Sequence, residues 1–148
     1  MLQISIKKFT KLTTTELYEI LQLRSEVFVV EQECVYQDID YKDQKAIHVL
    51  GYKNEKLIAY TRIFKPGDYF EEASIGRVVV AENQRKFGYG HIIMEHSIEA
   101  IKACFNEITI KISAQQYLQN FYEAHKFHQI SEAYLEDNIP HIAMLKSN

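Results

Sequence analysis

One segment of the sequence, residues 78–94, restricts the possible folds more than any other part of the chain. It begins with three valines, passes through a polar loop that contains Arg85 and Lys86, reaches Gly88 and Gly90, and continues as an apolar pattern with helical spacing. This order predicts a strand, a loop and the start of a helix. Glycine lets a backbone approach a ligand closely, and the free N–H groups at a helix start carry a partial positive charge. The segment is therefore predicted to bind an anion such as a diphosphate.

The length and charge of the chain argue against several other classes of protein. A chain of 148 residues is expected to form a single domain, residues 1–148, with one core. The net charge of −3 argues against a broad basic surface for nucleic acid. The sequence has no signal-peptide pattern and no apolar run of roughly 18 residues, so we expect a cytoplasmic protein without a membrane partner.

Hydrophobic periodicity places the other elements along the chain. Thr13 and Glu16 form a capping-box pattern at the start of a helix that continues through Phe28, and a polar, acidic loop follows over 31–45. The other predicted helices cover 88–104 and 116–125, and the predicted strands cover 2–8, 46–53, 57–65, 74–80, 107–113, 127–135 and 140–146. This order predicts mixed α/β packing around one sheet.

The glycine loop also has a simpler interpretation, a turn that joins a strand to a helix. Two common phosphate-binding patterns are absent. No Gly-x-x-x-x-Gly-Lys-Ser/Thr sequence occurs, and the third glycine of a Rossmann fingerprint would fall on Ile93. The charges of Arg85 and Lys86 favour an anion site over a simple turn. The ligand is expected to be neither a nucleoside triphosphate nor NAD.

Two motifs together resemble those of the GNAT superfamily of acetyl-CoA-dependent N-acetyltransferases. They are the Arg-x-x-Gly-x-Gly loop after a valine-rich strand and the segment Phe121–Phe127. Four further blocks, 23–32, 36–40, 75–80 and 136–142, resemble the ElaA-like branch of that superfamily. The resemblance implies an α/β (α+β) GNAT fold. Such a fold has a mixed, mostly antiparallel sheet of about seven strands, with helices on both faces and splayed central strands.

The resemblance also implies a site for acetyl-CoA as the co-substrate. In the family, the central strand pairs with the pantetheine arm and the amides of the following loop hold the diphosphate. Carried over to this chain, the contacts are Val78, Val79, Val80, Arg85, Lys86, Phe87, Gly88, Tyr89, Gly90 and His91, together with Gln115, which stands where the family has an asparagine.

Tyr122 matches the family's tyrosine that protonates the departing thiolate. A phenol with the ordinary pKa of ~10 is protonated at neutral pH and can act as this acid. The alternative is a core tyrosine, because Leu118, Phe121 and Tyr122 form one apolar helix face.

For the general base, the family often places a glutamate on the central strand, but this strand offers Ser74 and Arg77. The remaining candidates are Glu31, Asp40 and His141. We assign the role to His141, because the ordinary pKa of histidine, ~6.5, suits a base at neutral pH. The alternative is a histidine with only a structural hydrogen bond.

Three arginines, Arg24, Arg62 and Arg77, lie where the pattern predicts apolar side chains. One interpretation is a set of structural ion pairs with the acidic residues of segment 31–43, because arginine is seldom buried without a partner. The other is a pocket for a polar acceptor. The predicted acceptor contacts are Arg24, Phe28, Glu31, Asp40, Arg62 and Arg77.

The function implied by the resemblance is transfer of an acetyl group to a primary amine by direct attack on the thioester. The acceptor is a small molecule or a peptide, and a homodimer is a further expectation from the family. The alternative is an acyl-CoA-binding or sensing domain without turnover, because the central strand lacks a glutamate. Neither the two cysteines, Cys34 and Cys104, nor the spacing of the histidines indicates a metal site.

Overall fold

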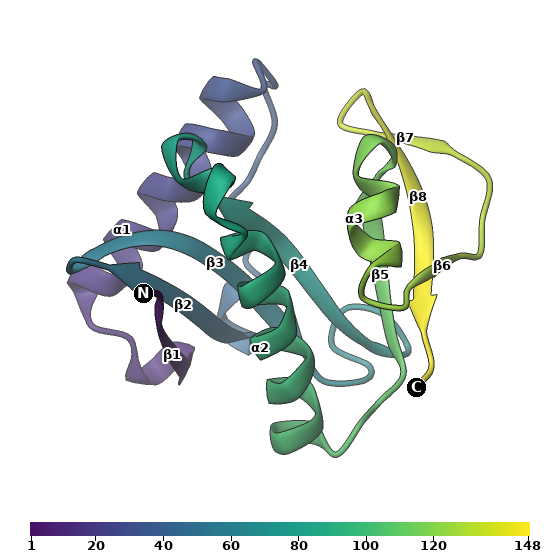
Figure 1. Ribbon diagram of the computed structural model, residues 1–148, viewed down its shortest axis with the longest axis horizontal. Helices are drawn as coiled ribbons and strands as arrows, with labels where there is room; N and C mark the ends of the chain where they lie inside the picture. The colour runs from purple at the N-terminus through teal and green to yellow at the C-terminus, as the bar shows by residue number, and fades with distance from the viewer.

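The computed structural model describes all 148 residues, which form an open sheet with helices on both faces (Figure 1). The strands are β1 (Gln3–Lys8), β2 (Ile47–Lys53), β3 (Lys56–Phe64), β4 (Ala73–Val80), β5 (Ile110–Gln115), β6 (His128–Gln129), β7 (Tyr134–Glu136) and β8 (Ile139–Lys146). The α-helices are α1 (Thr14–Arg24), α2 (Tyr89–Phe105) and α3 (Gln119–Glu123). Shorter helical turns are η1 (Phe9–Lys11), η2 (Ser25–Glu31), η3 (Asp43–Lys45), η4 (Glu82–Phe87) and η5 (Gln116–Leu118).

The sheet has the strand order β1-β2-β3-β4-β5-β8-β6, and β7 also pairs with β8. Neighbouring strands are antiparallel except β4 and β5, which run parallel. These two strands pair only at Ala73↔Ile110 and Ser74↔Lys111 and then diverge, as Figure 1 shows. The predicted mixed sheet with splayed central strands is confirmed, with eight strands where about seven were expected.

A β-bulge in β4 accompanies the divergence. Two residues of β4, Arg77 and Val78, lie opposite the single residue Thr61 of β3. Arg77 has a φ of 50°, in the left-handed region that side chains other than glycine rarely adopt. Because a bulge bends its strand and increases the local twist, this one helps to turn the second half of β4 away from β5.

Helices α1 and α2 cover opposite faces of the sheet. Thr61 and Arg62 are consecutive on β3, so their side chains point to opposite faces. The hydroxyl of Thr61 lies 2.6 Å from that of Ser97 on α2, whereas Arg62 and Arg24 of α1 both donate to one carboxylate oxygen. The fully buried apolar side chains of the two layers include Ile20, Leu23, Leu50, Ile63, Ile93, Met94 and Ile101.

The predicted capping box is confirmed, and one hairpin turn has an equally local cause. At the start of α1 the side chain of Thr13 accepts a hydrogen bond from the amide of Glu16 at 3.0 Å, and the Glu16 carboxylate accepts one from the amide of Thr13 at 2.8 Å. Between β2 and β3, Asn54 and Glu55 have φ values of 51° and 64°, as a two-residue type I′ hairpin turn requires. Both signals act within a few residues and therefore hold regardless of the tertiary structure.

Two predicted strands differ from the observed ones. The strand predicted over 107–113 begins only at Ile110, because its neighbours β4 and β8 reach no further than the residues opposite that position. The strand predicted over 127–135 consists of two short strands, β6 and β7. Between them the hydroxyl of Ser131 accepts a hydrogen bond from the amide of Ala143 at 2.9 Å, which takes the place of a ladder bond.

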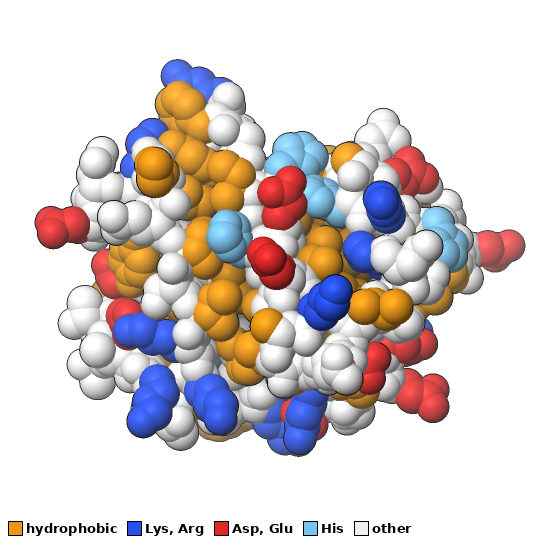
Figure 2. All heavy atoms as spheres, turned by 60° about the horizontal axis from the view of Figure 1, so that its bottom comes forward, with side chains coloured by type: hydrophobic (Ala, Val, Ile, Leu, Met, Phe, Trp, Pro, Cys, Tyr) orange, Lys and Arg blue, Asp and Glu red, His pale blue; other side chains and the backbone are white.

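None of the helices combines the length and the apolar character that crossing a bilayer requires. On the face drawn in Figure 2, basic and acidic side chains are interspersed with apolar ones. This mixed surface agrees with the small net charge of −3.

Candidate active site

The divergence of β4 and β5 opens a cleft of about 440 Å³ between the two halves of the sheet. Its walls come from η2, β4, the loop before α2, the start of α3 and the β7–β8 hairpin. Most of the predicted site residues line it, namely Phe28, Glu31, Arg77, Val78, Val79, Val80, Arg85, Gly88, Gly90, His91, Gln115, Tyr122 and His141.

The backbone of β4 is available at the edge of this cleft. Beyond Ser74, β4 has no partner on the β5 side. The amide of Ala81 donates to the carbonyl of Ile58 on β3 at 2.8 Å, so the N–H and C=O of Val80 point the other way, into the cleft. The Val80 carbonyl accepts a hydrogen bond from Nε of Arg85 at 3.0 Å. An extended ligand can therefore pair with this strand edge as an added strand would.

The loop after β4 ends in a glycine that joins two helical segments. Gly88 has a φ of 74°, and this left-handed conformation ends η4 and begins α2. No side chain caps the start of α2, so its first amides remain free for an anion. A Cβ atom on Gly90 would lie 3.2 Å from the ring of Phe121, so glycine at this position lets α3 approach the loop.

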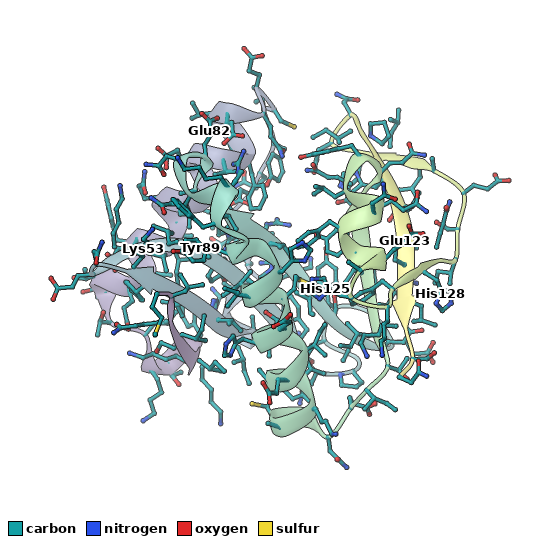
Figure 3. The ribbon with its side chains drawn as sticks, in the orientation of Figure 1. Lys53, Glu82, Tyr89, Glu123, His125 and His128 are labelled. Atoms are coloured by element: carbon teal, nitrogen blue, oxygen red, sulfur yellow. The ribbon has the colours of Figure 1, made fainter.

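Three of the predicted loop residues, Lys86, Phe87 and Tyr89, do not line the cleft with their side chains. The rings of Phe87 and Tyr89 pack together, and Nζ of Lys53 lies 4.1 Å and 5.2 Å from their centroids. Figure 3 shows Lys53 and Tyr89 on the side of α2 that faces away from His125. The predicted contacts of these residues depend on backbone amides, which are part of the loop whatever the side chains do.

Arg85 and Glu31 form an ion pair at the cleft. The guanidinium of Arg85 donates from Nη1 and Nη2 to the two carboxylate oxygens of Glu31, at 2.6 Å and 2.7 Å. These hydrogen bonds raise the pKa of Arg85. Arg85 lies beside the glycine loop and already binds one anionic group, the Glu31 carboxylate. The loop therefore has a side chain that is suited to binding an anion.

Tyr122 belongs both to the core and to the cleft. Its ring meets Phe121 and Phe127 edge-on and is 6 % exposed, yet it also lines the cleft. Burial raises the pKa of its phenol above the ordinary value, so the hydroxyl stays protonated at neutral pH. The two interpretations made from the sequence, core packing and a cleft residue, therefore describe the same side chain.

On the other wall, β5 and the β7–β8 hairpin carry a second polar cluster. Nδ1 of His141 lies 2.7 Å from the carbonyl oxygen of Ile139, and Nε2 lies 3.4 Å from Oε2 of Glu136. The hydroxyl of Ser113 donates to Oε1 of Glu136 at 3.1 Å and lies 2.5 Å from the hydroxyl of Tyr134. Ser113, Glu136 and His141 all line the cleft.

Glu136 and Asp137 are charged cleft residues that are absent from the predicted site. The predicted strands 127–135 and 140–146 leave Glu136 between them, whereas β7 includes Glu136 and the turn contains only Asp137 and Asn138, with φ values of 52° and 63°. A two-residue turn with positive φ at both positions is a known hairpin signal that Asn and Asp favour. Read in that way, the sequence would have placed Tyr134 opposite His141, as the structure does.

The histidines form one pair across the two helices at the cleft. Nδ1 of His91 and Nε2 of His125 lie 2.8 Å apart, with His125 between α2 and α3 (Figure 3). Burial and the neighbouring His91 lower the pKa of His125. No group of three His, Cys, Asp or Glu side chains is arranged to hold a metal ion.

The three arginines that break the apolar pattern form a network with three aspartates. Arg24 binds Asp38 at 3.0 Å and Asp43 at 2.7 Å. Arg62 binds Asp40 at 2.6 Å and Asp43 at 2.8 Å, and Arg77 binds Asp38 at 2.8 Å and Asp40 at 3.4 Å. The network fastens the acidic segment after η2 to the sheet through alternating charges.

This network corrects part of the predicted acceptor pocket. Arg24 and Arg62 are completely buried, and neither they nor Asp40 line the cleft. The ion-pair interpretation therefore applies to them, and of the predicted acceptor contacts only Phe28, Glu31 and Arg77 line the cleft. Burial alone would raise the pKa of the Asp40 carboxyl, but the hydrogen bonds and charge of Arg62 hold it well below the usual value.

Comparison with known proteins agrees with this geometry. The sequence matches the acetyltransferase (GNAT) domain family over residues 12–148. The chain belongs to the GNAT acetyltransferase family. It is 43% identical to the protein ElaA of Escherichia coli, over 93% of this chain and 91% of ElaA, and 42% identical to a UPF0039 protein of Schizosaccharomyces pombe, over 97% and 95%. The resemblance to the ElaA-like branch is thereby confirmed.

Two solved structures share the GNAT fold closely. An acyl-CoA N-acyltransferase from Pseudomonas aeruginosa matches with a TM-score of 0.94 and 39% identity, over 99% of this chain and 100% of that one. The crystal structure of E. coli ElaA matches with a TM-score of 0.93 and 40% identity, over the same shares. The predicted fold is thus confirmed over almost the whole chain.

Proposed function

We propose that this GNAT protein transfers the acetyl group of acetyl-CoA to a primary amine. The observation that carries the proposal is the unpaired edge of β4 beyond Ser74, which continues directly into the uncapped start of α2. A thioester ligand has an extended arm that suits a strand edge and a diphosphate that suits free helix amides. The description of the related P. aeruginosa protein as an acyl-CoA N-acyltransferase also supports it.

In this proposal, the segment from Val78 to Val80 pairs with the pantetheine arm and the amides between Arg85 and His91 bind the diphosphate. The side chain of Arg85 leaves Glu31 and neutralises phosphate charge. Gln115, which lies within 3.4 Å of Gln32 across the cleft, borders the arm. Together these groups hold the thioester between β4 and β5.

The reaction is direct attack of the amine on the thioester carbonyl. A nitrogen–carbon bond forms and the carbon–sulfur bond breaks, while the nitrogen loses a proton and the sulfur gains one. Tyr122 gives its phenolic proton to the leaving sulfur, and His141 takes the proton from nitrogen. Because both side chains line one cleft, the two proton transfers can accompany a single attack.

A second candidate, an acyl-CoA-binding or sensing domain, is favoured by one observation. The cleft side of β4 carries Gly76, Arg77 and the valines but no carboxylate to act as a base. If His141 is not a base, the protein can bind the thioester and still not turn it over. The two candidates make the same prediction for binding and opposite predictions for turnover.

Calorimetry with acetyl-CoA, with pantetheine as a control that lacks the diphosphate, tests the shared part of the proposal. Acetyl-CoA should bind and pantetheine should bind much more weakly, because the loop amides then have no anion to hold. Release of free thiol with a panel of primary amines then separates the candidates. Thiol release that depends on the amine supports a transferase, tight binding without it supports a sensor, and absence of binding at millimolar acetyl-CoA excludes both.

A further inference from the structure

We infer that Glu136 and His141 together bind the acceptor as an ammonium ion, so that the substrate is a cationic primary amine. The inference rests on the proposed function and adds the acceptor's charge and the residue that recognises it. It starts from the hydrogen bonds of the imidazole. Nδ1 of His141 lies 2.7 Å from the carbonyl oxygen of Ile139, which can only accept, so the ring carries its proton on Nδ1. The lone pair of the neutral ring is therefore on Nε2.

Nε2 of His141 faces Oε2 of Glu136 at 3.4 Å. In the neutral ring Nε2 is a hydrogen-bond acceptor, as is the carboxylate oxygen, so a donor from a ligand can lie between the two atoms. Two acceptors at this distance are satisfied by a donor that reaches both. An alkylammonium group has three N–H donors and a positive charge, and it can donate to Nε2 and to Oε2 at once.

The carboxylate is held in this position by its own contacts. Oε1 of Glu136 accepts a hydrogen bond from Ser113 on β5, which leaves Oε2 for the cleft. The ring of Tyr134 is stacked on that of His141, with centroids 6.2 Å apart, because the two residues are opposite each other in the ladder. Three strands thus fix the spacing of the pair before any ligand binds.

The charge balance of the cleft also favours a cation. Arg77 belongs to the network of three arginines and three aspartates, which is neutral as a whole. Arg85 is paired with Glu31. The remaining ionised side chains among the lining residues are Glu136 and Asp137, both negative. A substrate with a negative charge would be repelled by these carboxylates, whereas an ammonium group is attracted to them.

The pair also has the chemistry for the first step of the transfer. Nε2 of His141 takes one proton from the bound ammonium, and the resulting imidazolium is stabilised by the Glu136 carboxylate. The freed lone pair of the amine forms the nitrogen–carbon bond, and the carbon–sulfur bond breaks with protonation of the sulfur by Tyr122. The second nitrogen proton and the proton on His141 pass to solvent, and the Tyr122 phenolate recovers one from it. Glu136 thus acts as a binding residue and His141 as the base.

Two primary amines of equal size test the inference. Ethylamine and methoxyamine each have three heavy atoms, but at pH 7.5 ethylamine is an ammonium ion and methoxyamine is neutral. We expect Glu136→Gln to lower kcat/KM for ethylamine by about tenfold or more, because a hydrogen bond to a charged group is lost, and to change that for methoxyamine by less than about twofold. Glu132→Gln is the matched control, since it removes an equal charge from the same β6–β7–β8 segment outside the cleft and should leave the ratio of the two substrates near that of the unmodified protein.

Equal losses for both amines in Glu136→Gln, or a change of the substrate ratio in Glu132→Gln as large as that in Glu136→Gln, would overturn the inference and leave the proposed function standing. A second measurement does not depend on turnover. With CoA bound, ethylammonium chloride should shift the ring-proton resonances of His141, and the shift should be lost in Glu136→Gln. Thiol release with methoxyamine but no shift with ethylammonium would also reject the ammonium site, whereas no thiol release with either amine would reject the proposed transferase itself.

Discussion

At the scale of single residues, Tyr122 shows how one side chain can belong to a hydrophobic core and still line the cleft. Its ring lies between Phe121 and Phe127, while its edge borders the cleft. Burial raises the pKa of the phenol, so at neutral pH it holds its proton. In the proposed reaction this proton is available to the sulfur while the carbon–sulfur bond breaks, and the phenol recovers one from solvent.

Tyr122→Phe removes the acid and keeps the ring. We expect kcat to fall about 10²-fold, within the range for loss of a general acid, while the Kd for acetyl-CoA changes by less than about twofold. Steady-state kinetics and calorimetry measure the two quantities. Tyr117→Phe is the control, because Tyr117 also lines the cleft but is 72% exposed. Parallel losses in kcat and in affinity would assign Tyr122 to packing.

In the free protein Glu31 forms an ion pair with Arg85 and therefore competes with any phosphate that binds to the guanidinium. We expect Glu31→Gln to lower the Kd for CoA by about two- to fivefold, the size of a partly exposed ion pair. Glu82→Gln is the control, since Glu82 lies on the same loop (Figure 3) without binding Arg85. Calorimetry at low and high salt measures the effect. An unchanged or weaker affinity would mean that Glu31 does not compete with the cofactor.

At the scale of elements, the junction of η4 and α2 depends on one backbone conformation. Gly88 adopts φ of 74°, and a side chain there has open space but an unfavourable backbone. Gly88→Ala should lower the free energy of unfolding by about 1 kcal/mol or slightly more. Urea unfolding measures it, with Gly76→Ala as the control, because Gly76 has neither a positive φ nor a neighbour within 4 Å. Equal stability of the two variants would show that the junction relaxes without strain.

Some features of the helices and strands are set by neighbouring residues in the sequence, and others are set by distant residues that pack alongside. The capping box of α1 arises within four residues and was predicted from the sequence, and the type I′ turn between β2 and β3, whose type was not predicted, is equally local. The start of β5 and the break between β6 and β7 are set by which residues the neighbouring strands offer. Strand limits of this kind cannot be predicted from periodicity alone, since periodicity describes a strand and not its partners.

At the scale of the whole molecule, the network of arginines and aspartates joins α1, the segment 38–43, β3 and β4. Arg24, Arg62, Asp38 and Asp43 are buried and the other two members are half-buried, so the charges depend on one another. Removing one member leaves a buried charge without its partner, which is far more costly than the loss of an exposed ion pair. The network therefore stabilises one position of the acidic segment beside the cleft.

Asp43→Asn should lower the free energy of unfolding by about 3–5 kcal/mol, because Arg24 and Arg62 both lose a carboxylate. Asp68→Asn, which belongs to no ion pair, should change it by less than about 0.5 kcal/mol. Urea unfolding of the two variants gives the comparison. Similar small effects in both would mean that the network contributes little to stability.

Stability should also decrease as the pH falls. Burial lowers the pKa of His48 below the unfolded value of about 6.5, so below that pH the unfolded chain binds the proton first. Burial raises the pKa of Asp43, but the charge of Arg24 outweighs it and lowers the pKa below the unfolded value of about 3.9. The contribution of Asp43 to the free energy of unfolding is thus complete well above pH 4 and is lost below that pH. Urea unfolding at pH 7.5, 5.5 and 4 should show two successive decreases, and a stability that rises on acidification would contradict both assignments.

The site residues that could be predicted are likewise those whose role depends on neighbouring residues in the sequence. The glycine loop, the valine strand and Tyr122 lie in two continuous segments, and each has a pattern that local backbone physics explains. The hairpin of Glu136 could have been recognised from Asp137 and Asn138, whereas the individual aspartates of segment 31–43 that pair with Arg24 and Arg62 could not, because they are brought together only by the fold. The same limit led to Arg24, Arg62 and Asp40 being predicted as acceptor contacts.

The sequence by itself determined the order of most elements, the glycine loop between a strand and a helix, and the membership of the GNAT family, because these depend on periodicity, on glycine and on contiguous motifs. Only the tertiary structure decided that β4 and β5 diverge after two pairs and that three arginines are neutralised by three aspartates beside the cleft. The physical reason is that charge and pairing act between atoms that are close in space. Residues 24 and 43, or 62 and 40, become neighbours only when the sheet has formed.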